Sequence, residues 1–220
     1  MYKKSKLANG LRLITKHIDG VQSLSLGIWI NIGGRFESPQ QKGISHFLEH
    51  LLFKGSKKYS CRAIKESIEG VGGSLNGFTS EELTCFLVKI PSRYLHCAFD
   101  ILSDMVLNPL IKPADVDKEK TVILEELKMY RDLPQSYVYE LLDELLWPGQ
   151  PLGAPIIGTV ESLKGMTGGL IRSFQKTHYT PANIVISAAG SVQHDLLAGE
   201  VSAVFSKLSC SATNTFSPIQ

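Results

Sequence analysis

The sequence predicts an α+β fold in which a mixed, mainly antiparallel sheet packs against helices. Three observations favour this class. Apolar residues alternate over residues 21–32, which is typical of a half-buried strand. After Gly43 they recur every three or four positions, which is typical of a helix. Residues 72–79 and 83–90 form two strand-like segments joined by a short turn, as in an antiparallel pair rather than a repeating strand–helix–strand unit.

In the first half of the chain, glycine and proline residues bound the predicted elements. A turn signal precedes a strand-like run within residues 7–15, and Gly33 ends the strand predicted at 21–32. The helix that follows Gly43 is predicted to end near Gly55. The next elements are a helix at 61–69 closed by Gly70, strands at 72–79 and 83–90, and a helix at 92–107 stopped by Pro109.

In the second half of the chain, helical patterns dominate. Residues 113–131 predict a long helix, because Pro113 suits its start and Asp115 and Asp117 lie in the first turn, where acids favour the helix dipole. The remaining elements are a helix at 135–146, a surface loop at 147–158, a helix at 167–177, a strand at 183–190 and a helix at 194–208. We expect one domain over residues 1–208 and a Ser- and Thr-rich linker or tail over 209–220.

Composition excludes several classes of protein. The 220 residues are 43% hydrophobic and 20% charged, which is an ordinary globular balance. The net charge of +2 is too even to indicate nucleic-acid binding. The sequence has no apolar run long enough for a membrane span or a signal peptide, so we expect a cytoplasmic protein. The cysteines lack paired spacing and predict mostly buried free thiols; they are Cys61, Cys85, Cys97 and Cys210.

The most informative string is His46-Phe47-Leu48-Glu49-His50. On a helix, positions i, i+3 and i+4 share one face, so two imidazoles one turn apart can hold one metal ion with a carboxylate beside it. A catalytic zinc site also needs a third protein ligand and an open position for water. The candidates for that ligand on the predicted acidic helix are Glu119, Glu125 and Glu126.

The spacing of these acids suggests two different roles. Glu119 and Glu126 are seven positions apart and share a helix face, whereas Glu125 is turned by roughly 100° from Glu126. This pattern suits one metal ligand and one hydrogen-bond partner for a ligand histidine. The histidine motif itself stands among Phe and Leu residues, where ionisable groups are costly unless they are paired or bound to metal.

Five segments in the same order carry a family resemblance. They are Gly34–Glu37, Gly43–Gly55, Gly72–Thr79, Val122–Leu127 and Pro151–Gly158. Together they resemble the pitrilysin-type zinc peptidases, which include insulysin and the mitochondrial processing peptidase. The resemblance implies a zinc-dependent endopeptidase that hydrolyses peptides or short unfolded proteins. It also implies that this chain is the N-terminal catalytic half.

The resemblance implies a role for each matching residue. His46, His50 and Glu126 match the Zn²⁺ ligands, Glu49 matches the general base, and Glu119 matches a second acid that supports catalysis at the site. An edge strand that pairs with the peptide substrate is implied at Asn76, Gly77, Phe78 and Thr79. Glycine at position 77 departs from the usual alanine of the family and is expected to loosen this strand.

Length is the larger departure, because such peptidases usually have two homologous halves. The resemblance therefore implies a second homologous half or a partner subunit, and a homodimer is a further alternative.

The competing function is that of a non-catalytic structural or assembly homologue, although such relatives typically lose the metal motif. A second rival is S-ribosylhomocysteine lyase, which shares an H-x-x-E-H helix but has a shorter chain and a catalytic cysteine.

Overall fold

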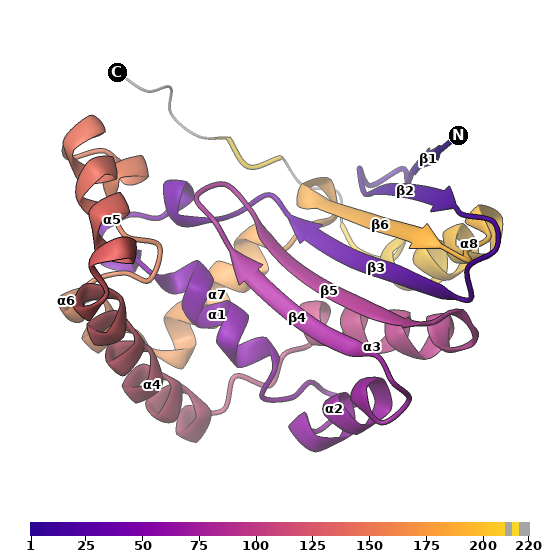
Figure 1. Cartoon of the computed structure of the whole chain (residues 1–220), viewed down its shortest axis with the longest axis horizontal. Helices are drawn as coiled ribbons and strands as arrows, with labels where there is room; N and C mark the ends of the chain where they lie inside the picture. The colour runs from indigo at the N-terminus through magenta and orange to yellow at the C-terminus, as the bar shows by residue number, and fades with distance from the viewer. Residues whose placement is uncertain (210–212, 216–220) are drawn as a thin grey trace.

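A computed structural model describes residues 1–209 and 213–215. Its strands form one six-stranded sheet (Figure 1). The strands are β1 (Lys3–Lys6), β2 (Arg12–His17), β3 (Ser23–Ile30), β4 (Ser74–Thr79), β5 (Thr84–Pro91) and β6 (Ile184–Gly190). The helices of the first 132 residues are α1 (Ile44–Leu52), α2 (Cys61–Glu69), α3 (Leu95–Leu107) and α4 (Pro113–Asp132). The later helices are α5 (Pro134–Leu146), α6 (Val160–Gly165), α7 (Gly168–His178) and α8 (His194–Phe205).

The order of strands in the sheet is β1-β2-β6-β3-β5-β4, so β4 lies at an edge. Within the described residues, β2 and β6 run parallel, and the other neighbouring pairs run antiparallel. The predicted mixed, mainly antiparallel sheet is therefore confirmed. The parallel pair brings the C-terminal part of the chain beside its start, as the orange and indigo strands in Figure 1 show.

The core lies between the sheet and its helices. Leu24, Leu26, Ile28 and Ile30 alternate along β3, and all are buried on the same face. Helix α3 packs on β3 and β5, α8 on β2, and α1 on β4 and β5. This arrangement fixes α1, which carries the histidine motif, directly against the edge strand.

Besides short 3₁₀ helices, the sequence prediction missed one strand and one α-helix, and both are short. Strand β1 consists of exposed or half-exposed polar residues that pair with β2, so it has no apolar alternation. Helix α6 has six residues and begins with a capping box made by Thr159 and Ser162 inside a segment without a helical period. The other predicted elements are present, with ends that shift by a few residues, and a short 3₁₀ turn (Pro151–Gly153) interrupts the predicted loop.

The thiols and the tail differ partly from expectation. Three cysteines within the described residues are free, as predicted, but Cys61 and Cys97 are half-buried and Cys85 is buried, so "mostly buried" is wrong. Cys210 lies outside the described residues.

In the C-terminal segment, Asn214 donates its backbone N–H to Asn183 and its side-chain amide to the carbonyl of Asn31. The interpretation of 209–220 as a linker stays a prediction, because most of that segment lies outside the described residues.

None of the helices in the described part of the chain combines the length and apolar character that crossing a bilayer requires. The location of the protein stays a prediction from the sequence.

Candidate metal centre

Helix α1 presents the histidine motif on the face opposite to its apolar stripe. Phe47, Leu48 and Leu51 are buried in the core, which fixes the rotation of the helix. His46 and His50 then share one side, with ring centroids 4.6 Å apart. Their side chains are 14% and 22% exposed, so both imidazoles border a cleft rather than bulk solvent.

Helix α4 brings the acids to this side of α1. Its inward residues are Val116, Ile123 and Leu127, spaced at helical intervals together with the buried Glu119. Glu126 lies beside this stripe and points to the histidines. Glu125 points away, because its carboxylate pairs with Lys128 and is 65% exposed. Packing therefore distinguishes the three candidate acids.

The three predicted ligands meet at one point. The Glu126 carboxylate lies 3.8 Å from Nε2 of His46 and 3.5 Å from Nε2 of His50. One donor atom from each residue can be chosen so that all lie within 4.8 Å of one another. Zinc bonds of ~2.0–2.1 Å in a tetrahedral site place ligand atoms ~3.3 Å apart, so the set fits this ion after small adjustments.

The protonation states also suit a metal. Burial, and then the neighbouring His50, lower the pKa of His46 to about 4, so its imidazole is neutral at physiological pH. A neutral imidazole is the form that binds metal. Two nitrogens and one carboxylate are donors that zinc accepts, and such a set leaves a fourth position for water.

Glu119 contacts the predicted ligand His50. Its Oε2 lies 3.1 Å from Nδ1 of His50, and its Oε1 lies 2.6 Å from the ammonium of Lys54. A carboxylate on Nδ1 keeps the proton there and leaves Nε2 free to bind metal. Glu119 thus contacts a predicted ligand, and its role at the site stays a prediction. The sequence reasoning missed Lys54, which lies in the turn after α1, and its position four residues beyond His50 was the available signal.

Glu49 belongs to α1, and its side chain contacts β4. The Thr79 hydroxyl donates to Oε2 of Glu49 at 3.1 Å. Burial raises the pKa of the Glu49 carboxyl, and the hydrogen bond from Thr79 opposes that shift. A carboxylate with a raised pKa is a better proton acceptor near neutral pH. Thr79, predicted to bind substrate, thus also contacts the predicted base.

Gly77 lets the strand approach the predicted base closely. A Cβ atom at this position would lie 3.0 Å from Oε1 of Glu49 and 3.0 Å from the ring of Phe53. The residue pairs in register with Phe86 of β5, so β4 is continuous here. The missing side chain leaves room for the Glu49 carboxylate beside the sheet edge.

A cleft of about 570 Å³ opens in front of these groups. Gly77, Phe78 and Thr79 line it from β4, whereas Asn76 is exposed on the same strand outside the lining. Its other walls come from α4, α5 and the segment 152–157. The sequence reasoning did not single out several lining residues, which include Glu81, Tyr130, Ser136, Tyr139, Glu140 and Asp143.

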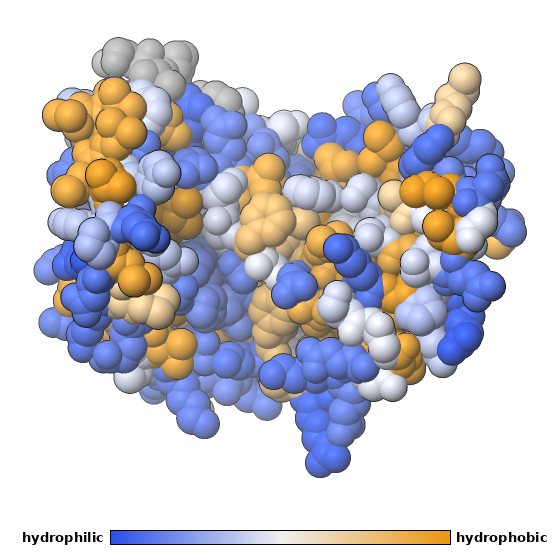
Figure 2. All heavy atoms as spheres, in the orientation of Figure 1, coloured by the Kyte–Doolittle hydropathy of each residue, from blue (hydrophilic) through white to orange (hydrophobic). Residues whose placement is uncertain are grey.

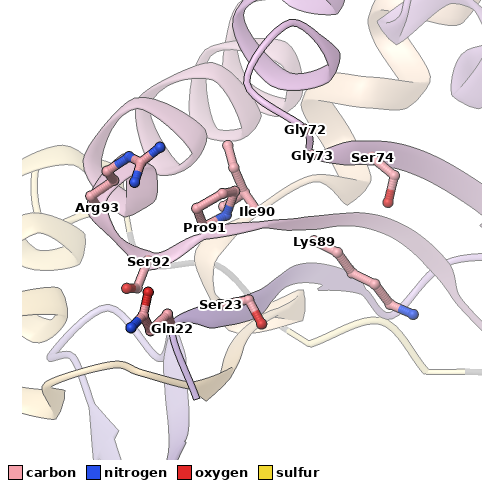
Figure 3. A pocket seen from close by; sticks show the side chains of 10 residues that line it. All are labelled: Gln22, Ser23, Gly72, Gly73, Ser74, Lys89, Ile90, Pro91, Ser92 and Arg93. Atoms are coloured by element: carbon pink, nitrogen blue, oxygen red, sulfur yellow. The ribbon is translucent and has the colours of Figure 1, made fainter. Parts of the chain in front are cut away.

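A second hollow of about 640 Å³ lies where β3 begins, β4 begins and β5 ends (Figure 3). Its charged side chains are Lys89 and Arg93, and its ten lining residues include no histidine, cysteine or carboxylate. It contains none of the residues predicted for the site. The chemistry-bearing groups therefore gather in the cleft at the other end of β4.

The fold and the donor set define a class of protein. Two histidines one turn apart, a glutamate between them and a carboxylate from a second helix form the arrangement of inverted-motif metallopeptidases. The chain belongs to the insulinase family, peptidase family M16, whose family model matches residues 12–160.

Similar proteins agree with this membership. An uncharacterized zinc protease of Streptomyces coelicolor is 39% identical over 205 residues, which are 93% of this chain and 45% of that protein. A probable mitochondrial-processing peptidase subunit beta of Arabidopsis thaliana is 36% identical over 95% of this chain and 39% of that protein. The crystal structure of a Helicobacter pylori protease matches with a TM-score of 0.91 at 20% identity, covering 100% of this chain and 53% of that one. The chain thus spans about half the length of its relatives, and the last match shows the fold alone.

Proposed function

We propose that this chain is the catalytic half of a zinc-dependent endopeptidase. His46, His50 and Glu126 would hold the metal, and Glu49 would act as the general base. The main support for this proposal is that ligand atoms of three side chains from two helices lie within 4.8 Å of one another, beside the buried carboxylate of Glu49. When bound, zinc supplies a positive charge that polarises the scissile carbonyl and lowers the pKa of water towards about 7.

Glu49 would move the proton in both halves of the reaction. Its carboxylate takes a proton from the attacking water while the water oxygen bonds to the carbonyl carbon. It then gives that proton to the leaving amine as the C–N bond breaks. The raised pKa from burial supports the first transfer, and the bond from Thr79 supports a fixed orientation during both.

The edge strand β4 supports a peptide substrate. In the described part of the chain no strand pairs with its outer side, so the backbone groups on that side can pair with an extended peptide. The strand ends at Thr79, beside Glu49, which would place the paired backbone next to the reacting groups. Phe78 is 45% exposed and lines the cleft, where it would contact a substrate side chain.

Helix α5 supports the proposal of a second homologous half. None of its 13 residues is buried, although most of its residues are apolar. Orange spheres mark this surface at the upper left of Figure 2, where α5 lies in Figure 1. The apolar residues that are more than a third exposed there are Val138, Tyr139, Leu141, Leu142, Leu145 and Leu146. The doubled length of the relatives supplies an occupant of matching size for such a surface.

The decisive experiment replaces the base in the full-length, two-half protein. Glu49→Gln should keep one zinc per active site and lower the cleavage rate of an unstructured peptide by at least ~10²-fold, as loss of general-base catalysis does. Glu66→Gln on the exposed surface of α2 makes the same chemical change away from the cleft and should keep full activity. Full activity of the Glu49→Gln protein would remove Glu49 as the base.

A non-catalytic scaffold is the competing function. The complete donor set and the fixed Glu49 count against it, because a scaffold does not need them. Zinc bound at one equivalent without peptide cleavage, even in the full-length protein, would favour the scaffold. Cleavage by the full-length protein but not by this chain alone would support the need for a second half.

A further inference from the structure

Glu37 is a buried carboxylate that the proposed reaction does not use. It lies between the 3₁₀ turn at Gly34–Phe36 and α1, and it is 2% exposed. Oε2 accepts the backbone N–H of Gly43 at 2.8 Å, and Oε1 accepts that of Ser45 at 2.8 Å. These N–H groups lie at the N-terminal end of the helix that carries the histidines, where an isolated helix leaves them without partners. Burial raises the pKa of the Glu37 carboxyl, and the hydrogen bonds from Ser45 and Gly43 oppose that shift.

Lys42 is a buried ammonium that reaches the wall of the cleft. It is 7% exposed, and its Nζ donates to the carbonyl of Gly34 at 3.0 Å and to that of Pro151 at 3.3 Å. Pro151 begins the segment 151–158, named here the wall segment, whose residues 152–157 line the cleft. Lys42 therefore joins the residues before α1 to the wall that faces the predicted ligands.

The backbone of α1 and that of the wall segment also touch directly. Gly43 has φ +85, and a Cβ atom there would lie 2.4 Å from the carbonyl oxygen of Ile157. Gly158 has φ +90, and a Cβ atom there would lie 2.5 Å from the carbonyl oxygen of Lys42. Ser162 donates its hydroxyl to that same Lys42 carbonyl at 2.7 Å. This junction admits no side chain at either glycine.

We propose that Glu37 and Lys42 form a buried clamp that positions the metal-binding helix against the wall of the cleft. Glu37 holds the first turn of α1 through two hydrogen bonds from its backbone N–H groups. Lys42 fixes the wall segment relative to the same helix end. The clamp sets the distance between the histidines and the wall segment, so both Glu37 and Lys42 are positioning residues. The inference rests on the proposed function for zinc binding and peptide cleavage, whereas the hydrogen-exchange test is independent of it.

The first test measures zinc affinity by competition with a chromogenic chelator. Glu37→Ala should weaken zinc binding by about 10-fold or more, as loss of a group that orients ligands does. It should also speed hydrogen exchange of the Gly43 and Ser45 amides. Glu37→Gln keeps one acceptor oxygen and should give an intermediate loss. Ser60→Ala removes the cap of α2, which carries no ligand, and should lower the melting temperature without changing zinc affinity.

The outcomes separate positioning from general stability. Wild-type zinc affinity in Glu37→Ala would overturn the role of Glu37, as would an equal loss of affinity in Ser60→Ala. Should Glu37→Ala fail to fold, Glu37→Gln decides by the same comparison. Lys42→Met keeps the apolar stem and should raise KM several-fold in the full-length protein with little change in kcat, and an unchanged KM would refute the link to the wall. If the wild-type protein cleaves no peptide, the proposed function fails, while the affinity and exchange measurements still decide the clamp.

Discussion

Replacement of Glu119 tests how strongly this site depends on a group that would not touch the metal. Glu119 is 5% exposed and holds Nδ1 of His50 at 3.1 Å while Lys54 holds its other oxygen at 2.6 Å. Glu119→Ala removes the acceptor that selects the tautomer of His50 and lets its ring turn. Glu119→Gln keeps an oxygen acceptor but loses the charge that makes the imidazole a stronger donor to metal.

The expected magnitude follows from this single contact. Loss of a carboxylate behind a ligand histidine typically weakens metal binding by about 10–100-fold. That range corresponds to roughly 1.4–2.8 kcal/mol of binding free energy. Because Glu119 is almost fully buried and paired with a cation, we expect Glu119→Ala near the upper end and Glu119→Gln near the lower end.

The assay is zinc affinity of this chain by chelator competition, with the unfolding midpoint measured in parallel. Glu125→Ala is the matched control, since it removes the same charge from the same helix at a site that is 65% exposed and paired with Lys128. Its zinc affinity should equal that of the wild type. Equal affinities in Glu119→Ala and Glu125→Ala would refute the view that Glu119 orients His50.

Three further predictions concern pH and packing. Thr79→Val removes the hydrogen bond that lowers the pKa of Glu49, so the acid limb of the kcat/KM profile should move to higher pH, whereas Thr79→Ser should keep it in place. His46 has a folded-state pKa of about 4 against 6.5 when unfolded, so the unfolded chain binds more protons between these values. The unfolding free energy of the metal-free chain should therefore be highest above pH 6.5 and fall by up to roughly 3 kcal/mol towards pH 4. Urea titrations at several pH values would measure this decrease, and it should be much smaller in His46→Gln. Leu26→Ala in the core should cost about 2–5 kcal/mol of unfolding free energy, whereas Leu145→Ala on α5, at 77% exposed, should cost less than about 0.5; similar costs would contradict the packing described.

Local patterns predicted most of the fold. The alternation in β3 and the three-and-four spacing in α1 are dictated by backbone geometry, so they can be recognised without knowing the neighbours. The same geometry places His46, Glu49 and His50 on one side of a helix. Elements without an apolar period, such as β1 and α6, escaped because their stability comes from pairing and capping rather than from a buried stripe.

The sequence by itself determined a two-histidine helix, an acidic helix and the sheet class. Its periods left Glu119, Glu125 and Glu126 open, and family resemblance chose among them. Only the tertiary structure decided which carboxylate faces the imidazoles and which one contacts Nδ1 of His50. It also decided that Glu37 accepts a hydrogen bond from the backbone at the start of α1. These contacts depend on how α1 docks against α4 and the wall segment, and local periodicity carries no information about where distant segments meet.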